Sequence, residues 1–481
     1  MKSGIVAKVV GSILIIESGL LALPLLVAFF YKEAAWREFL LTMGLTFIVG
    51  GLLTRVKTHS KSIKAREGIM IVAFGWVLVS FFGSLPLYLT QGAPSFIDAL
   101  FETISGFTTT GASVLDDVES LPRSILFWRS FTHWIGGMGI LVFTLALLPA
   151  LGIGSMQIFK AETPGPFAGK VAPRMRDTAR VLYVTYFTLT LTEIVFLLLS
   201  GMSLFDSALI TFGTVGTGGF APYNDSLTRF NSSVHFIVSF FMLLAGVNFS
   251  LHYLLYKRKY LDILKDNELR LYTKFVLVAT LLIAVDLVVT GYQSVFFAGR
   301  DALFQVASIM TTTGYSTVDF QEWPTFTRSI LLVLMFVGGS AGSTAGGMKV
   351  IRILIIFKLI KRELSKTFHP RALIPIKLGD RAISNESVAG VYSFLGLHLV
   401  MFIMGTLLIS LDRVDMITAI SSSAATLNNI GPGFNLVGPT ATYSHFSSFS
   451  KGVFCVLMLL GRLELFTIIA LFVPKSWTKE S

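Results

Sequence analysis

The amino-acid sequence predicts an all-α polytopic membrane protein, and three observations support that prediction. Hydrophobic residues make up 53% of the 481 positions and charged residues only 14%, whereas about 25% of the residues in a soluble domain are charged. The apolar residues gather into ten stretches long enough to cross a bilayer, and a glycine-containing tract recurs four times between them. A soluble fold could not bury this much apolar surface. The composition therefore argues against a soluble enzyme, a nucleic-acid-binding protein and a disordered scaffold.

The predicted transmembrane helices follow one another along the whole chain, and some are separated by shorter apolar pieces. These pieces have about a dozen residues each, too few to cross a bilayer, and each leads into Gly- and Thr-rich sequence. We expect them to be re-entrant half-helices. The ten predicted transmembrane helices are 5–30, 38–54, 68–90, 124–150, 180–200, 232–256, 273–292, 327–357, 387–410 and 448–473, and the short pieces are 95–107, 204–215, 300–311 and 413–426.

Positive charge is concentrated in four loops, which predicts the orientation of the chain. Loops 55–66, 155–180, 257–274 and 358–381 contain 23 of the 39 Lys and Arg residues, whereas the opposite loops carry acidic residues such as Asp116. By the positive-inside rule the basic loops are cytoplasmic, and ten crossings then place both termini on that side. The net charge of +11 is expected to meet anionic membrane lipids, and nucleic acid is not an expected partner.

A unit of helix, half-helix, glycine tract and helix occurs four times after an N-terminal hairpin. Placing Gly111, Gly218, Gly314 and Gly431 in register gives spacings of 107, 96 and 117 residues. Self-similarity of this kind indicates that one structural unit is used repeatedly. The sequence predicts a transmembrane hairpin at 1–54 and pore repeats at 68–150, 178–256, 272–357 and 387–473.

The four tracts predict a pore for a cation. Non-helical backbone at membrane depth is tolerated only where protein buries it or water lines it. Four tracts around one axis can form a ring of backbone carbonyls that replaces the hydration shell of a cation, and the partly negative C-terminal ends of the half-helices favour a cation too. The residues expected to supply these carbonyls are Thr110, Gly111, Thr217, Gly218, Thr313, Gly314, Ile430 and Gly431.

The span 327–357 is longer than one crossing requires, and glycines interrupt it. Eleven helical residues reach about 16 Å deep, so the interruption lies near mid-membrane, where a flexible loop would block an ion path until it moved. A small-residue packing face is the alternative. Arg462 lies about 21 Å into the last span, either below the tracts against loop carbonyls or snorkelling toward the inner surface. Lys349 is either a boundary anchor or part of a gate.

Four further motifs accompany the glycine tracts: Trp134–Gly139, Ala161–Pro166, Gly338–Lys349 and Gly461–Glu464. With the tracts, these motifs resemble the TrkH/TrkG/KtrB family of potassium transporters over nearly the whole chain. The N-terminal hairpin is similar to the ten-span TrkH branch. In the second tract, Gly216 stands where the resemblance leads us to expect a bulkier residue.

The resemblance implies a K⁺-selective pore in the bacterial cytoplasmic (inner) membrane, with K⁺ at the filter as the only metal ion. It also implies a homodimer and a TrkA-type cytoplasmic nucleotide-binding regulatory protein as partner. No complete Walker A or GxGxxG motif is present, so this chain is expected to hold no organic cofactor. The glycine-rich interruption matches the family's intramembrane gate, and the gate residues expected on this basis are Gly338, Gly339, Gly342, Gly346, Gly347, Lys349 and Arg462.

The predicted function is potassium uptake through a channel-like pore, without enzymatic activity. A secondary transporter coupled to H⁺ or Na⁺ through buried carboxylates such as Glu17, Glu193 and Asp286 is the first alternative. Such transporters usually have inverted repeats, whereas these repeats run in one orientation. Arg129 and His133, one turn apart, are expected to be paired and structural. A polytopic membrane enzyme is less favoured, because no cluster of catalytic residues is evident.

Overall fold

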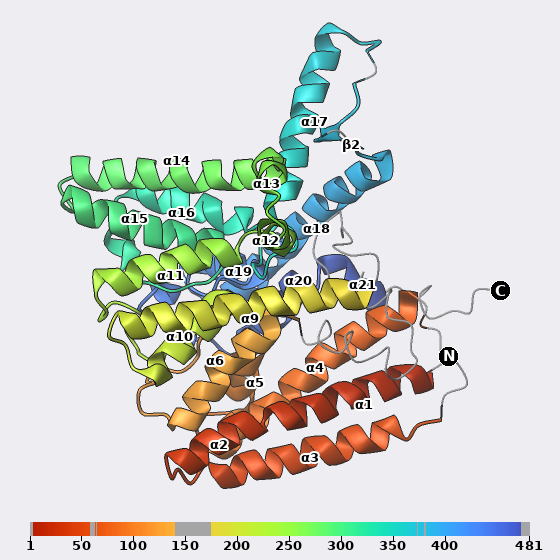
Figure 1. Ribbon diagram of the computed structural model, residues 1–481, viewed down its shortest axis with the longest axis vertical. Coiled ribbons are helices and arrows are strands. Elements are labelled where there is room, and N and C mark those ends of the chain that lie inside the picture. Colours follow the sequence, from red (N-terminus) through yellow and green to blue (C-terminus); the bar gives the residue numbers. More distant parts are fainter. Residues whose placement is uncertain are drawn as a thin grey trace.

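The computed structural model is mostly helical, with long helices lying side by side (Figure 1). Two short strands, β1 (Lys377–Leu378) and β2 (Arg381–Ala382), pair antiparallel. The structure describes residues 3–57, 63, 65–139, 175–372, 374–379 and 381–472. The end of the predicted span 124–150, most of loop 155–180 and the Ala161–Pro166 motif lie outside these residues.

The N-terminal segment forms a hairpin. Helix α1 (Ser3–Leu20) continues as α2 (Ala22–Phe30) and packs against α3 (Trp36–Thr54). The two arms meet at Gly11 and Gly50, where a Cβ atom on Gly11 would lie 2.6 Å from the Gly50 carbonyl oxygen. Small residues allow helix backbones to approach this closely in membranes, so the hairpin packs as one unit beside the four repeats.

In each of the four repeats a long helix leads into a short one. The side chains of Ser95, Ser203 and Asp415 cap three of the short helices by accepting backbone hydrogen bonds. The predicted short apolar pieces are therefore helices with defined beginnings. The long and short helices are, in order, α4 (Ala65–Leu89) and α5 (Phe96–Phe107), α9 (Met175–Leu199) and α10 (Leu204–Gly216), α14 (Asn267–Val289) and α15 (Val295–Met310), and α18 (Asn385–Ile409) and α19 (Met416–Leu427).

The second half of each repeat begins with another helix. The first repeat has α6 (Arg123–Gly137), and the described residues stop just beyond it. The other three are α11 (Ser232–Ala245) with α12 (Phe249–Tyr256), α16 (Thr325–Val337) with α17 (Val350–Phe368), and α20 (Ser448–Arg462) with α21 (Leu465–Phe472). Shorter helices are α13 (Tyr260–Lys265), η2 (Phe320–Glu322), η3 (Ser410–Asp412) and η4 (Asn435–Val437).

The predicted spans 232–256 and 448–473 are each broken into two helices. Helices α11 and α12 are bent by 98°, because the Asn248 side chain caps α12 by accepting from the Ser250 N–H at 2.9 Å. Between α20 and α21, Glu464 takes a φ of +55°. Both breaks lie inside apolar sequence, so hydropathy does not reveal them.

Six helices of the described part are long and apolar enough to cross a membrane, and the bent pair α11–α12 would make a seventh. The fold is thus that of a polytopic, mostly helical membrane protein. The count of ten crossings also requires the shorter and broken helices to be joined, and it stays a prediction.

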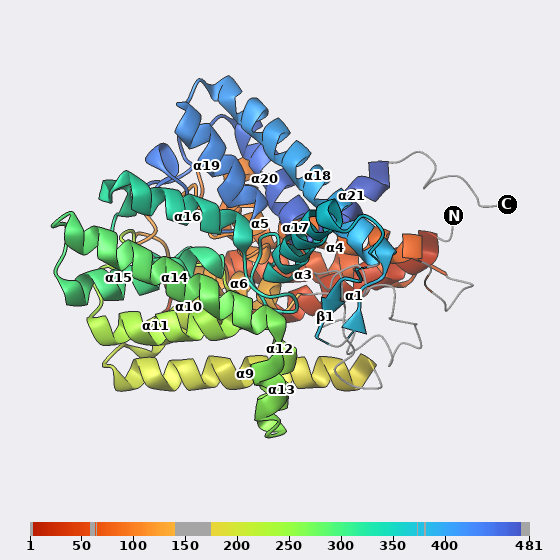
Figure 2. The same ribbon diagram turned by 90° about the horizontal axis from the view of Figure 1, so that it is seen from above.

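The repeats close into a ring. Helix α6 packs against α10, α11 against α15, α16 against α19, and α20 against α5. Each repeat therefore presents its second helix to the short helix of the next repeat. Figure 2 shows α9 on one side of the molecule and α18, α19 and α20 on the opposite side. This arrangement brings the four glycine tracts, which follow the short helices, to the centre.

Helix α17 departs from this bundle. It runs across the direction of α9 and α14 and projects beyond them (Figure 1). Its exposed face carries Lys361, Phe357 and Phe368, and Lys358 lies half-buried beside them. The helix thus offers a charged surface outside the bundle.

Candidate functional site

Each short helix ends in the same backbone motif, which sets the register of the glycine tracts. A residue with left-handed φ is followed, two positions later, by a glycine with positive φ. The residue between them donates its N–H at 2.8 Å to the carbonyl five residues earlier, which is the bond of a Schellman cap. The four motifs are Thr109-Thr110-Gly111, Thr217-Gly218-Gly219, Thr312-Thr313-Gly314 and Asn429-Ile430-Gly431.

This geometry corrects the register predicted for the second repeat. Gly219, with a φ of +80°, matches Gly111, and Gly218 matches Thr110. The predicted pair Thr217 and Gly218 is therefore shifted by one residue from the other three pairs. Several neighbouring glycines occur in this tract, so spacing alone did not identify the equivalent one. In this register Gly216 matches Thr108, Thr311 and Asn428, so it does stand where a bulkier residue was expected, and Gly218 lacks a second side chain, the one that Thr110, Thr313 and Ile430 carry.

The tracts form a closed ring in which each glycine abuts the next tract. A Cβ atom on any ring glycine would come within 3.0 Å of a carbonyl oxygen of the following tract, closer than real Cβ atoms approach. That carbonyl belongs in every case to the residue before the next ring glycine. The pairs are Gly111 with Gly218, Gly219 with Thr313, Gly314 with Ile430, and Gly431 with Thr110.

Side chains behind the ring hold the tracts together. The hydroxyl groups of Thr108 and Thr110 lie 2.8 Å apart, and the equivalent Thr311 and Thr313 lie 2.7 Å apart. Asn429 reaches across to donate to the Thr110 hydroxyl at 2.9 Å. All of these side chains are buried. The ring is therefore supported by polar contacts within and between quarters.

An outer cavity of about 140 Å³ lies on the face that carries the acidic loops, and all four ring glycines line it. Behind Arg129, which lines this cavity, lies Glu102. Glu102 accepts from Arg129 Nε at 2.9 Å and from the Val114 N–H at 3.0 Å. Nearby, the Asn224 side chain donates to Asp117 at 3.1 Å and thereby lowers the pKa of that carboxyl group. The entrance to the outer cavity therefore carries the negative charge of Asp117 at neutral pH.

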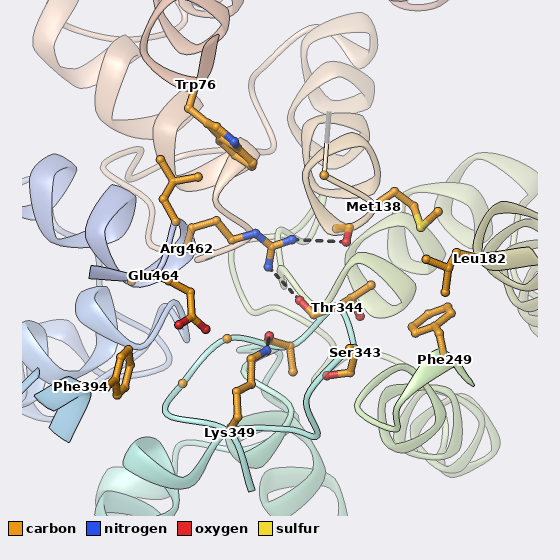
Figure 3. Close-up of a pocket in the computed structure, with 18 residues that line it drawn as sticks. Trp76, Met138, Leu182, Phe249, Ser343, Thr344, Lys349, Phe394, Arg462 and Glu464 are labelled. Carbon is orange, nitrogen blue, oxygen red and sulfur yellow. Dashed lines mark hydrogen bonds between the residues drawn. The ribbon is translucent and has the colours of Figure 1, made fainter. Parts of the chain in front are cut away.

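An inner cavity of about 110 Å³ lies on the opposite side of the ring (Figure 3), and five of the seven predicted gate residues line it: Gly342, Gly346, Gly347, Lys349 and Arg462. The guanidinium of Arg462 extends toward Thr344 and the end of α6 in this view. It donates to the Thr344 carbonyl at 2.8 Å, to the Thr109 hydroxyl at 3.1 Å and to the Gly136 carbonyl. Arg462 therefore joins the loop to the base of the first tract.

The loop 338–349 folds back on itself beneath the ring. A Cβ atom on Gly347 would lie 2.7 Å from the Cα atom of Gly338, so the two ends of the loop meet. Gly346 donates its N–H to the Thr312 hydroxyl at 2.6 Å, and Lys349 donates to the Ala345 carbonyl. Of the remaining predicted residues, Gly339 accepts from the Val350 N–H and Gly342 from the Phe249 N–H, both at 3.0 Å.

Sequence reasoning missed two carboxylates that hold the loop. Glu268 accepts from the Ala341 N–H at 2.7 Å and from the Ile351 N–H at 3.1 Å. Glu464 pairs with Arg352 at the start of α17. Glu268 stands in the basic loop 257–274, which also contains Asp262 and Asp266, so the sequence alone did not single it out.

The three carboxylates that a coupled transporter would use, Glu17, Glu193 and Asp286, belong to the long helices α1, α9 and α14. Asp286 accepts from the Thr327 hydroxyl at 2.7 Å, which joins α14 to α16. Glu17 and Glu193 are fully buried, and their carboxylate oxygens have no hydrogen-bond partner among the described residues.

Known proteins share the sequence pattern and the fold of this chain. Residues 36–479 match the TrkH family, described as a cation transport protein. The chain is 37% identical over 484 residues to the Trk system potassium uptake protein TrkH of Halomonas elongata, covering 100% of both chains. It is 38% identical over 481 residues to TrkH of Escherichia coli, covering 98% of this chain and 99% of that one. The crystal structure of the potassium transporter TrkH from Vibrio parahaemolyticus matches with a TM-score of 0.89 and 35% identity, covering 99% of this chain and 100% of that one.

Proposed function

Because this chain belongs to the TrkH family of cation transport proteins, we propose that K⁺ crosses the membrane through the ring formed by its four glycine tracts. The protein is a multi-pass inner-membrane transporter for potassium uptake, not an enzyme. Transport through the ring needs no resident cofactor, because the ion itself is the substrate.

The closed ring is the observation that carries this proposal. Each ring glycine leaves room for a carbonyl oxygen of the neighbouring tract, so four carbonyl groups meet at one level. Carbonyl dipoles can replace the hydration shell of K⁺, and the C-terminal ends of the short helices add negative potential. The selectivity filter then comprises Thr110, Gly111, Gly218, Gly219, Thr313, Gly314, Ile430 and Gly431.

Flux into proteoliposomes tests the pathway. We expect rapid uptake of K⁺ and Rb⁺ and much slower uptake of Na⁺, driven by the ion gradient alone. Uptake that requires a proton or sodium gradient would instead favour the coupled transporter. Glu17 and Glu193 support this alternative, because their buried carboxylate oxygens have no hydrogen-bond partner in the part of the chain that the structure describes.

The loop 338–349 and Arg462 are proposed to gate the pore. The loop lies directly beneath the ring, and its backbone binds Thr312 and Asn428 at the base of two tracts. The positive charge of Arg462 opposes a cation at the same level. Together these groups obstruct the path to the inner cavity.

Ten crossings with both termini in the cytoplasm are proposed for the topology. The count of ten is reached when each broken pair of helices, α11–α12, α16–α17 and α20–α21, is taken as one crossing. The start of α1 and the end of α21 lie toward the same end of the molecule in Figure 1, which supports a shared side for the termini. A homodimer and a TrkA-type nucleotide-binding partner are proposed as the assembly, with the basic helix α17 as a contact surface.

A further inference from the structure

The second quarter of the ring lacks a side chain that the other three quarters possess. The residue before the ring glycine is Thr110, Thr313 or Ile430 in three repeats, and it is buried in each. In the second repeat this residue is Gly218. Because glycine restricts the backbone least, the Gly218 peptide needs support from elsewhere to hold its carbonyl.

The His133 ring occupies the space where a Gly218 side chain would lie. A Cβ atom on Gly218 would come within 3.0 Å of three atoms of this ring. His133 belongs to α6, the second helix of the preceding repeat, which packs against α10. The missing volume in the second quarter is thus filled from the first repeat.

His133 is itself held in a fixed orientation. Its Nδ1 atom lies 2.8 Å from the Gly106 carbonyl oxygen near the end of α5. A carbonyl oxygen can only accept, so Nδ1 carries the proton and donates it. The ring also packs on Phe220, with centroids 4.2 Å apart, and is fully buried. These contacts hold the ring against Gly218.

We propose that His133 is a positioning residue for ion selectivity, which fixes the Gly218 carbonyl of the filter. This inference rests on the proposed role of the ring. The Gly218 carbonyl is the one against which Gly111 packs, and His133 also binds the helix end that precedes the first tract. A single imidazole therefore sets the relative position of two quarters of the ring.

The test removes side-chain volume at position 133 and adds it at position 218, first separately and then together. His133→Ala should lower the ratio of K⁺ to Na⁺ uptake in proteoliposomes by roughly tenfold, equivalent to about 1.4 kcal/mol of lost discrimination. Gly218→Thr should lower it too, because the new side chain meets the His133 ring. The double variant should recover most of the wild-type ratio, since its threonine supplies the volume as Thr110 and Thr313 do.

Two further variants separate positioning from general stability. His133→Asn retains a donor for the Gly106 carbonyl and should lose less selectivity than His133→Ala. His235→Ala is the matched control: His235 is also buried, on α11, and also contacts a backbone carbonyl, that of Leu227 at 2.9 Å. This change should leave the K⁺/Na⁺ ratio unaltered.

Two results would overturn the proposal: a wild-type ratio in His133→Ala, or a double variant no better than either single one. Gly111→Ser, measured in parallel, shows which idea has failed. If Gly111→Ser loses selectivity while His133→Ala does not, the ring remains the filter and only the role of His133 is wrong. If neither loses selectivity, the filter assignment itself fails.

Discussion

At the scale of single residues, the ring glycines are required for two separate physical reasons. Gly111 has a φ of +79°, which costs other residues about 1–2 kcal/mol. A side chain there would also collide with the neighbouring tract. Strain alone lowers stability, whereas the collision changes the positions of the carbonyl oxygens. The two effects can be measured apart.

We predict that Gly111→Ser lowers the K⁺/Na⁺ uptake ratio by roughly tenfold or more, while the protein still inserts and dimerises. Gly201→Ser is the control, because Gly201 has a φ of +93° but nothing within 4 Å of an added Cβ atom. The control should share the strain and keep the wild-type ratio. Liposome flux with exchanged ions measures both. An unchanged ratio in Gly111→Ser would remove this glycine from the filter.

At the scale of elements, the loop 338–349, proposed as the gate, is held by groups from distant parts of the chain. Arg462 reaches it from α20, Glu268 from α14, and Thr312 from the base of the third tract. Buried loop carbonyls and N–H groups need such partners, because an unpaired one costs about 1–3 kcal/mol. These contacts stabilise the loop in the conformation observed here.

We predict that Arg462→Ala raises basal K⁺ flux by about ten- to a hundredfold, since each charged hydrogen bond contributes about 1.5–3 kcal/mol to the closed state. Selectivity should stay nearly unchanged. Deletion of residues 341–345 should also raise the flux, and combining the two changes should add little because both act on one gate. Additive increases, or wild-type flux in Arg462→Ala, would leave the arginine as a snorkelling anchor.

The buried pair of Glu102 and Arg129 ties the first short helix to α6 and to the segment after the first tract. Glu102→Gln should lower stability by about 3–5 kcal/mol, because removal of one partner leaves a buried charge unpaired. Glu119→Gln breaks an exposed pair with Arg229 and should cost less than about 1 kcal/mol. Thermal unfolding in detergent compares the two variants. Equal effects would contradict a supporting role for the buried pair.

At the scale of the whole molecule, α17 is the element that projects from the bundle. Reversing Lys361, Arg362 and Lys366 to glutamate should reduce recovery of a soluble nucleotide-binding protein from native membranes by at least about tenfold, an effect that salt should mimic. The same reversal at residues 257–259 controls for net charge. If neither set changes recovery or the nucleotide dependence of flux, the basic loops serve orientation only.

Much of this architecture could be predicted from the sequence, because apolar length and repeated glycines report local requirements. Arg462 contacts the Thr344 carbonyl of the loop, which is one of the two placements that the sequence left open for it. The register at Gly219 could not be predicted, since it depends on a helix cap rather than on spacing. The bend before α12 depends on the side chain of Asn248, which a hydropathy profile does not weigh.

The four quarters of the ring belong to a single polypeptide, and this has an evolutionary consequence. In an assembly of four identical chains, one codon change would alter all four positions at once. Here one codon change alters a single quarter and leaves three intact. Selectivity can therefore be adjusted in small steps, and a substitution in one repeat can be compensated by a neighbour. The exchange of a side chain at Gly218 for the imidazole of His133 is the kind of divergence that such an arrangement permits.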